Sequence, residues 1–262
     1  MIPEAGDVLA VVEKLENFID ESAFIPASHF YRSRVLLALL SKALTVSRAL
    51  CALVEAGFFA EAFGMSRTLV DLFLSVRYIG NRDTEARAKK FADYFAKAHE
   101  KWTGIIEDYY PERKDLPMPD FHDEAMKIAK EFKSGHQWTG LGGQTKIMAL
   151  EEDAYEFDPR GEGIKHDFDY NVIYWWTSQY VHGTVVSLQE HAAAEGSIFH
   201  IRARVFDEKR RGYDALFNAL IFLSKMFVCA FRAMNADQPE EILGEVGKLA
   251  KAFAGDGKSD HT

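Results

Sequence analysis

The segment Tyr170–Gln189 places the strongest constraint on the fold. It contains no Asp, Glu, Lys or Arg, in a chain where 27% of the residues are of these four types. A helix at a protein surface has a charged face, so a helix without one is normally enclosed by other helices. The segment also carries Tyr174, Ser178 and His182 at intervals of four, which places them on one side of a helix. We therefore predict a long, buried central helix that carries a polar row.

Helical periodicity runs through almost the whole chain. Apolar residues recur at intervals of three and four in most segments, as between Glu4 and Asp20. The pattern predicts an all-α fold, a single bundle of about seven or eight helices over residues 1–256, with a disordered tail at 257–262. Residues 111–166 are predicted to form a loop-rich excursion with short helices, because proline and glycine are frequent there. Residues 197–205 alternate as a strand would and are predicted to be extended, as one arm of a hairpin.

The charge balance limits the classes of partner. The net charge is −9, from 31 basic and 40 acidic residues, whereas a protein that binds nucleic-acid backbones normally has a basic excess. A nucleic-acid partner is therefore not expected, although a local basic groove stays open. The densest basic run, Lys209–Arg211, is interpreted as a solvated helix start.

The cysteines and the N-terminus bear on location. Cys51 and Cys229 are far apart, and each lies in an apolar helical pattern, which favours reduced core thiols over disulfides or zinc ligands. The first residues include acids where a signal peptide would be basic. The polar content of Tyr170–Gln189 argues against a membrane helix. We predict a cytoplasmic protein without a membrane segment.

In the segment from Phe58 to Ile79, polar residues share one helix face with apolar residues of the core type. The residues on this face are Arg67, Val70, Asp71, Leu74 and Tyr78. If that face is buried, its charge pair needs compensation, because removing one partner of a buried pair costs roughly 3–5 kcal/mol. Antiparallel packing against the central helix would bring Arg67 and Asp71 level with Ser178 and His182, and we predict this proximity.

The sequence SRTLVDLFLSVRYIG, the turn Trp138–Gly140 and the sequence YWWTSQYVHG together resemble a family of bacterial proteins, domain of unknown function number 5677. Members share an Arg followed four residues later by an acid and then by a Tyr, a Trp-Ser/Thr-Gly turn, and a Tyr-x-x-x-Ser-x-x-x-His helix. The resemblance covers roughly Leu50 to Leu188. This chain has Asp71 where the family usually has Glu. The resemblance implies an all-helical fold with a shared polar cluster and implies no activity.

Two hypotheses for the cluster assign it no catalytic role. In the first, the side chains form a buried hydrogen-bond network that fixes the packing of two helices. In the second, Arg67 receives an anionic group bidentately while Tyr174 and Ser178 orient it, with Tyr78 and Trp138 as further ligand-binding candidates. The second hypothesis describes a binding or interaction protein, whose partner is a small anionic ligand or another protein.

A third hypothesis is catalytic. His182 would act as general base, oriented by Asp71, on Ser178 or on a bound water. The interior of a helix offers no free N–H groups for an oxyanion hole, which disfavours serine hydrolysis.

The alternative function is a ribonuclease or toxin of a bacterial defence system, related to the HEPN nucleases. Those enzymes carry an Arg followed after four to six residues by a His. Arg160 and His166 have this spacing, but two intervening glycines disfavour a helix. The chain has no repeated Glu-x-x-His, so we predict neither a metal nor a cofactor. Its aromatic content is compatible with a homodimer, without indicating a surface.

Overall fold

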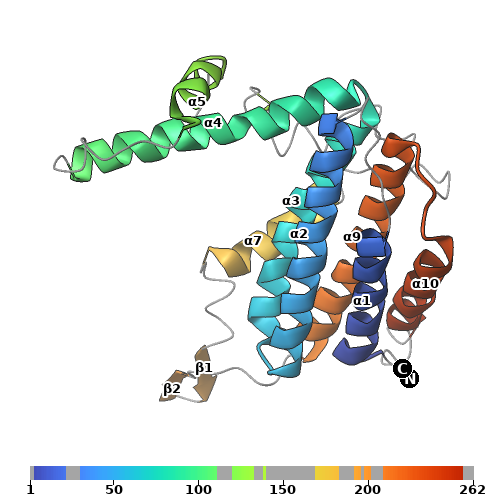
Figure 1. Cartoon of the computed structure of the whole chain (residues 1–262). Coiled ribbons are helices and arrows are strands. Elements are labelled where there is room, and N and C mark those ends of the chain that lie inside the picture. The colour runs from blue at the N-terminus through green and yellow to red at the C-terminus, as the bar shows by residue number, and fades with distance from the viewer. Residues whose placement is uncertain are drawn as a thin grey trace.

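The computed structural model describes residues 3–21, 30–110, 120–132, 138–139, 169–182, 192–195, 198–201 and 209–255. These residues form eight α-helices, one π-helical segment and one β-hairpin (Figure 1). The helices make up the all-α bundle that the periodicity predicts.

The bundle consists of long helices packed side by side. They are α1 (Ala5–Glu21), α2 (Phe30–Glu55), α3 (Phe59–Asn81), α9 (Lys209–Met234) and α10 (Glu240–Gly255). Among the described elements, the most extensive contact joins α3 and α9, and α2 packs against both (Figure 1). Helices α1 and α10 pack against each other, and they cover α2 and α9. The centre of the bundle is therefore the α3–α9 pair.

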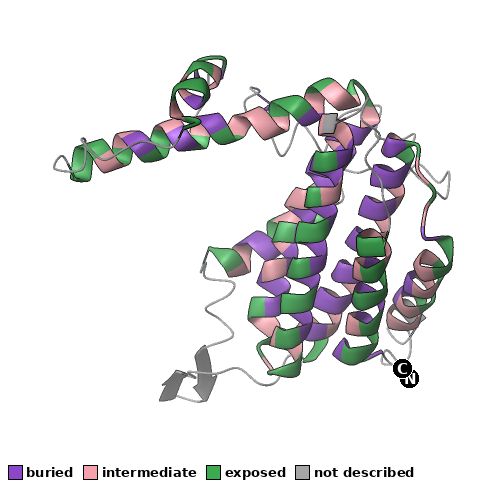
Figure 2. Ribbon diagram, viewed as in Figure 1, coloured by how far each residue is buried: buried purple, intermediate pink, exposed green. Residues whose placement is uncertain are grey.

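Close approach and aromatic packing hold α3 against α9. A Cβ atom on Gly80 would lie 3.3 Å from the Ala233 Cβ and 3.6 Å from the Cys229 carbonyl oxygen, so glycine allows the two backbones to approach. The rings of Phe73 and Phe222 pack with centroids 5.6 Å apart. Both rings are almost completely buried, and buried residues follow the inner faces of the two helices (Figure 2).

Helix α4 (Thr84–Tyr109) leaves the bundle at the end of α3. Asp83, with φ of +47°, turns the chain between the two helices. Near the start of α4, the Glu85 carboxylate accepts hydrogen bonds from the N–H groups of Tyr31 (3.0 Å) and Arg32 (2.9 Å), which lie in the first turn of α2. These donors have no partner within their own helix, so Glu85 anchors α4 to α2.

The outer half of α4 extends beyond the bundle and carries α5 (His122–Ala129) (Figure 1). The two helices meet at Ala96, Ala125 and Ala129, a small apolar cluster separate from the main core. Alanine at all three positions lets the two backbones lie close together.

The prediction of one long buried helix over Tyr170–Gln189 is wrong. A π-helical segment, η4 (Asp169–Tyr174), leads into the short helix α7 (Trp175–Val181), and residues 183–191 lie outside the described part of the chain. Trp175 and Trp176 are 51% and 39% exposed, so α7 lies on the surface of α3 rather than inside the bundle. The long buried helices are α3 and α9.

The predicted hairpin arm is confirmed within the described residues. Strand β1 (Ala192–Glu195) pairs antiparallel with β2 (Ile198–Ile201), with Ala192 opposite Ile201. Helix α5 confirms one short helix of the predicted excursion. Most of residues 111–166 and the tail 257–262 lie outside the described residues, and the single-domain organisation stays a prediction.

Two described helices are long and apolar enough to cross a membrane. They are the part of α2 from Tyr31 to Glu55 and the whole of α9, and 56% and 67% of their most apolar windows are buried in the bundle. Length and hydropathy do not separate a membrane span from a core helix, so the absence of a membrane segment stays a prediction.

If the α3–α9 contact supports the bundle, Phe222→Ala will lower the free energy of unfolding by about 3–5 kcal/mol, because it removes a fully buried ring and leaves a cavity. Lys42→Ala, at an exposed position of α2, will change it by no more than about 0.5 kcal/mol. Urea denaturation followed by circular dichroism measures both. Equal effects for the two variants would contradict this account of the core.

Candidate functional site

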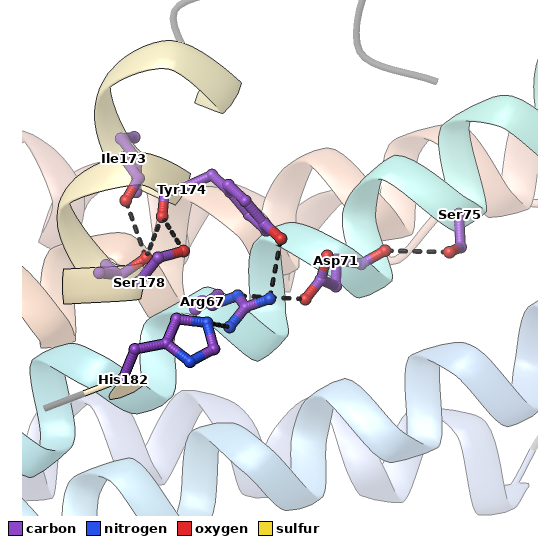
Figure 3. A network of polar contacts seen from close by, with 8 residues as sticks. Arg67, Asp71, Ser75, Ile173, Tyr174, Ser178 and His182 are labelled. Carbon is purple, nitrogen blue, oxygen red and sulfur yellow. Dashed lines mark hydrogen bonds and ion pairs between the residues drawn. The ribbon is translucent and has the colours of Figure 1, made fainter. Parts of the chain in front are cut away.

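The candidate site lies where α7 crosses α3. A Cβ atom on Gly64 would approach the Tyr180 Cβ to 3.2 Å, so the missing side chain lets α7 lie close to α3. The Phe63 and Tyr180 rings pack edge to face at 5.2 Å beside this crossing. Three residues further along α3, Arg67 points its side chain toward α7 (Figure 3).

The Arg67 guanidinium joins the two helices. Its Nη2 donates a hydrogen bond to the Tyr174 hydroxyl (2.8 Å), and its Nη1 lies 2.9 Å from His182 Nε2 (Figure 3). The guanidinium carbon also lies 4.8 Å from the centre of the Tyr174 ring. An arginine keeps its protons and only donates, so His182 Nε2 is the acceptor in this contact.

Asp71 is the acidic neighbour of Arg67. Its Oδ2 lies 3.8 Å from Arg67 Nε, too far for a hydrogen bond, and Nε is buried without a hydrogen-bond partner among the described residues. Burial raises the pKa of the Asp71 carboxyl to about 6, and the opposing effect of Arg67 is smaller. Solvent still reaches 43% of the Asp71 side chain, so water attenuates this effect.

The hydroxyl groups of α7 bond to their own helix. Ser178 Oγ donates to the Tyr174 carbonyl oxygen (2.6 Å), and Thr177 Oγ1 donates to the Ile173 carbonyl oxygen (2.8 Å). This back-bonding is the usual alternative for serine and threonine inside helices. His182 bonds to Ser178 through the backbone, from its N–H to the Ser178 carbonyl oxygen (3.1 Å). The expected contact between the Ser178 hydroxyl and the His182 ring is not among the bonds of the described residues.

The other two predicted ligand-binding residues lie in a second cluster. The Tyr78 and Trp138 rings pack edge to face at 5.5 Å, and Phe91 packs on the same Trp138 at 5.1 Å. The Arg87 guanidinium lies 3.9 Å from the centre of the Tyr78 ring and donates to the Tyr78 carbonyl oxygen. Trp138 is only 5% exposed, so this cluster is part of the main core.

The structure thus brings together Arg67, Asp71, Tyr174 and His182, as the helical spacing predicts. It turns the Ser178 hydroxyl away from the cluster and places Tyr78 and Trp138 elsewhere. The catalytic and binding roles stay predictions.

The sequence interpretation missed Arg211. Its guanidinium carbon lies 5.3 Å from the centre of the Phe63 ring and 5.3 Å from that of Tyr180, so α9 places a second cation at the crossing of α3 and α7. The run Lys209–Arg211 was the available signal, and its interpretation as solvated is wrong for Arg211, which is half-buried.

Two cavities lie away from this cluster. One, of about 430 Å³, lies between α2 and α4 and is lined by Tyr31, Arg34 and Phe91 among others. The other, of about 220 Å³, is lined mainly by residues of α1, α2 and α9, with Phe59 of α3. Neither of these two cavities includes Arg67 in its lining.

These features define the class: an all-helical bundle with a half-buried arginine cluster between two of its helices. The model of a family of unknown function (DUF5677) matches residues 33–198, which is more than half of the chain. The chain belongs to this family. Comparison with the curated proteins and with the solved structures found no match.

The Arg67–Tyr174 contact predicts energetic coupling between α3 and α7. In a double-mutant cycle of Arg67→Gln and Tyr174→Phe, the free energies of unfolding will deviate from additivity by about 1 kcal/mol, since each single variant removes the same hydrogen bond. The matched cycle of Arg67→Gln with Tyr78→Phe will be additive within about 0.5 kcal/mol. Coupling in the second cycle but not in the first would contradict the geometry.

The raised pKa of Asp71 predicts a pH-dependent stability. The folded protein holds this proton more tightly than the unfolded chain, whose carboxyl has the ordinary value of 3.8. The contribution of Asp71 to stability is therefore complete below about pH 4 and is lost as the pH rises through about 6. Urea denaturation at pH 4.5 and at pH 7.5 gives the free energy of unfolding of wild type and of Asp71→Asn. The variant will gain stability relative to wild type when the pH is raised from 4.5 to 7.5. An opposite change, or none, would show that the carboxyl is not destabilised.

Proposed function

We propose that the protein binds an anionic ligand through Arg67, and that it is a binding module rather than a hydrolase. The single observation behind this proposal is that both hydrogen-bond partners of the guanidinium, His182 Nε2 and the Tyr174 hydroxyl, are groups other than a carboxylate. Its positive charge is therefore oriented by hydrogen bonds that involve no carboxylate.

Within the described structure, the neighbouring acid lies at ion-pair distance from this charge but makes no hydrogen bond to it. Asp71 lies 3.8 Å from Arg67 Nε, and its pKa of about 6 leaves part of it protonated in mildly acidic solution. Arg67 uses two of its five N–H donors on His182 and Tyr174, and 22% of its side chain is exposed. A carboxylate or phosphate would meet a cation that is already held in place, which reduces the entropic cost of binding.

Two contacts favour binding over hydrolysis. The His182 Nε2 lone pair accepts from Arg67, so it is not free to take a proton from a substrate or a water. The Ser178 hydroxyl donates to the backbone of its own helix and does not contact the imidazole in the described structure. Catalysis would require both side chains to leave these partners.

One observation favours the ribonuclease alternative. The Arg67–His182 contact places a phosphate-binding cation beside a potential general base, a combination suited to phosphodiester cleavage. An RNA phosphate on Arg67 would have to release Nε2 of His182 first. Arg160 and His166, which have the HEPN spacing, lie outside the described residues.

We also infer a cytoplasmic location. Its support is that Cys51 and Cys229 are both buried, unpaired thiols, and burial raises the pKa of each to about 12. Thiols kept protonated inside a core are inert and suit a reducing compartment.

Thermal unfolding with inorganic phosphate and with citrate, each titrated separately, tests the proposal. An anion at 100 times its Kd will stabilise the wild type by about 2.7 kcal/mol, seen as a higher Tm. Arg232→Gln, which removes an exposed arginine of α9, will keep this increase, and Arg67→Gln will lose it. Isothermal titration calorimetry of the same variants gives the Kd values.

Two outcomes would overturn the binding proposal. If neither anion raises the Tm of the wild type, or if Arg67→Gln responds like wild type, Arg67 is not an anion site. If the wild type degrades total RNA while a folded His182→Ala variant does not, the protein is a nuclease.

A further inference from the structure

Asp71 is the acid of the Arg67 cluster, and its position does not suit an ordinary ion pair. Its Oδ2 lies 3.8 Å from Arg67 Nε, which is within ion-pair distance but too far for a hydrogen bond (Figure 3). Nε is closed to solvent and has no hydrogen-bond partner within the described structure. A buried N–H group without a partner costs free energy and is uncommon, so this one calls for an explanation.

One further oxygen atom fits between the two side chains. A hydrogen bond of about 2.8 Å from Arg67 Nε and one of about 2.6 Å from a protonated carboxyl can reach a shared acceptor oxygen across a gap of 3.8 Å. The two bonds would meet at that oxygen at about 90°, so the donors do not collide. The gap is therefore too wide for a direct hydrogen bond and has the right width for two bonds to one ligand oxygen.

Asp71 can supply its half of this arrangement only in the protonated form. An ionised carboxylate has no proton to donate, whereas a neutral carboxyl donates one hydrogen bond and does not repel an anion. Burial raises the pKa of the Asp71 carboxyl to about 6, so the proton is held up to mildly acidic pH. An anion bound to Arg67 would favour the same form, because it repels the carboxylate.

Arg67 is the charged neighbour that dominates the surroundings of this carboxyl. The elements packed on α3 bring further charged and titratable groups to this region, namely Tyr174 from η4, His182 from α7, and Arg211 and Lys225 from α9. Among the charges of the described residues, Arg67 is the one that shifts the pKa of Asp71, and burial outweighs it. Histidine side chains titrate in the same pH range, so an experiment has to separate Asp71 from His182.

We propose that Asp71 belongs to the anion site and binds the ligand as a protonated carboxyl, donating to an oxygen that Arg67 also binds. This inference rests on the proposed function, since it needs an anion at Arg67. The ligand is then an oxyanion, with a phosphate, sulfate or carboxylate group, and it binds together with one proton. Nε is closed to solvent without ligand, so Asp71, whose side chain is 43% exposed, turns aside as the oxygen enters.

The arrangement makes the affinity for the anion depend on pH. Above about pH 6 the free protein has lost the proton that the complex requires, so the apparent Kd rises about tenfold for each further pH unit. Below about pH 6 the carboxyl is already protonated, and the Kd levels off. An anion site made of arginine alone would show neither effect, because arginine keeps its proton throughout this range.

Sulfate is the probe for this coupling, because it stays a dianion from about pH 5 to about pH 8 and any proton taken up is bound by the protein. Isothermal titration calorimetry at pH 7.5 in HEPES and in Tris counts the protons, since the two buffers release them with different enthalpies. The wild type will take up close to one proton, and its Kd will be about fiftyfold higher at pH 8 than at pH 6. Glu61→Gln, which removes an exposed acid from the same helix, will leave both values unchanged.

Substitutions of Asp71 separate a donor from a negative charge. Asp71→Asn has a donor that never ionises, so its Kd at pH 8 will approach that of the wild type at pH 6, and its proton uptake will disappear. Asp71→Leu removes the charge without supplying a donor, and its Kd will be about tenfold higher than that of Asp71→Asn. His182→Gln will still take up the proton, because glutamine accepts from Arg67 without titrating. Circular dichroism shows whether each variant is folded.

Equal Kd values for Asp71→Asn and Asp71→Leu would overturn the proposal, because the carboxyl would then act through its charge alone. It would also be overturned if the wild type bound sulfate without proton uptake, or if the uptake disappeared in His182→Gln instead of in Asp71→Asn. In each of these cases Arg67 would remain an anion site. If the wild type bound neither sulfate nor phosphate, or if Arg67→Gln bound them as tightly, the proposed function would fail together with this inference.

Discussion

The close packing of α3 against α9 is the constraint on which the other parts of the structure depend. Gly80 lets the two backbones approach, and the Phe73–Phe222 contact fills the space beside them. With one face of α3 occupied by α9 and another by α2, its remaining face is left for α7. Gly64 marks a second close approach there, to Tyr180. A single helix thus carries two glycine contacts, one that holds the bundle and one that seats the polar cluster.

The position of α7 sets the electrostatics of that cluster. A guanidinium cannot lose its proton when it is partly buried, so it needs acceptors. Tyr174 and His182 supply them from opposite ends of α7, whereas the carboxyl of Asp71 remains at a distance and is itself destabilised as an anion. The same contacts that fasten α7 to α3 therefore leave the guanidinium without a hydrogen-bonded carboxylate. For this reason an architectural role and a binding role of Arg67 are compatible.

Sequence periodicity predicted which residues lie on the same face of a helix, because this depends on their angle around the helix axis. The intervals between Arg67 and Asp71, and between Tyr174 and His182, place each pair on one face, and the structure brings these faces together. Periodicity does not predict how far apart two residues of the same face lie along the helix axis. Tyr78 shares the face of Arg67, but eleven residues separate them, about 16 Å at 1.5 Å per residue. It therefore meets Trp138 instead of the cluster.

The absence of charged residues from Tyr170–Gln189 predicted its helical structure better than it predicted its burial. The segment satisfies the hydroxyl groups of Thr177 and Ser178 on its own backbone and exposes Trp175 and Trp176, so part of its described surface is open without any charge. Helix α4 shows the converse, since it is charged along its length and yet exposes Phe95, Trp102 and Tyr109. Hydrophobicity alone does not distinguish an interior from an interface, because both exclude water. The distinction lies in what surrounds a face, and these three aromatic residues lie in the outer half of α4, which extends beyond the bundle (Figure 1).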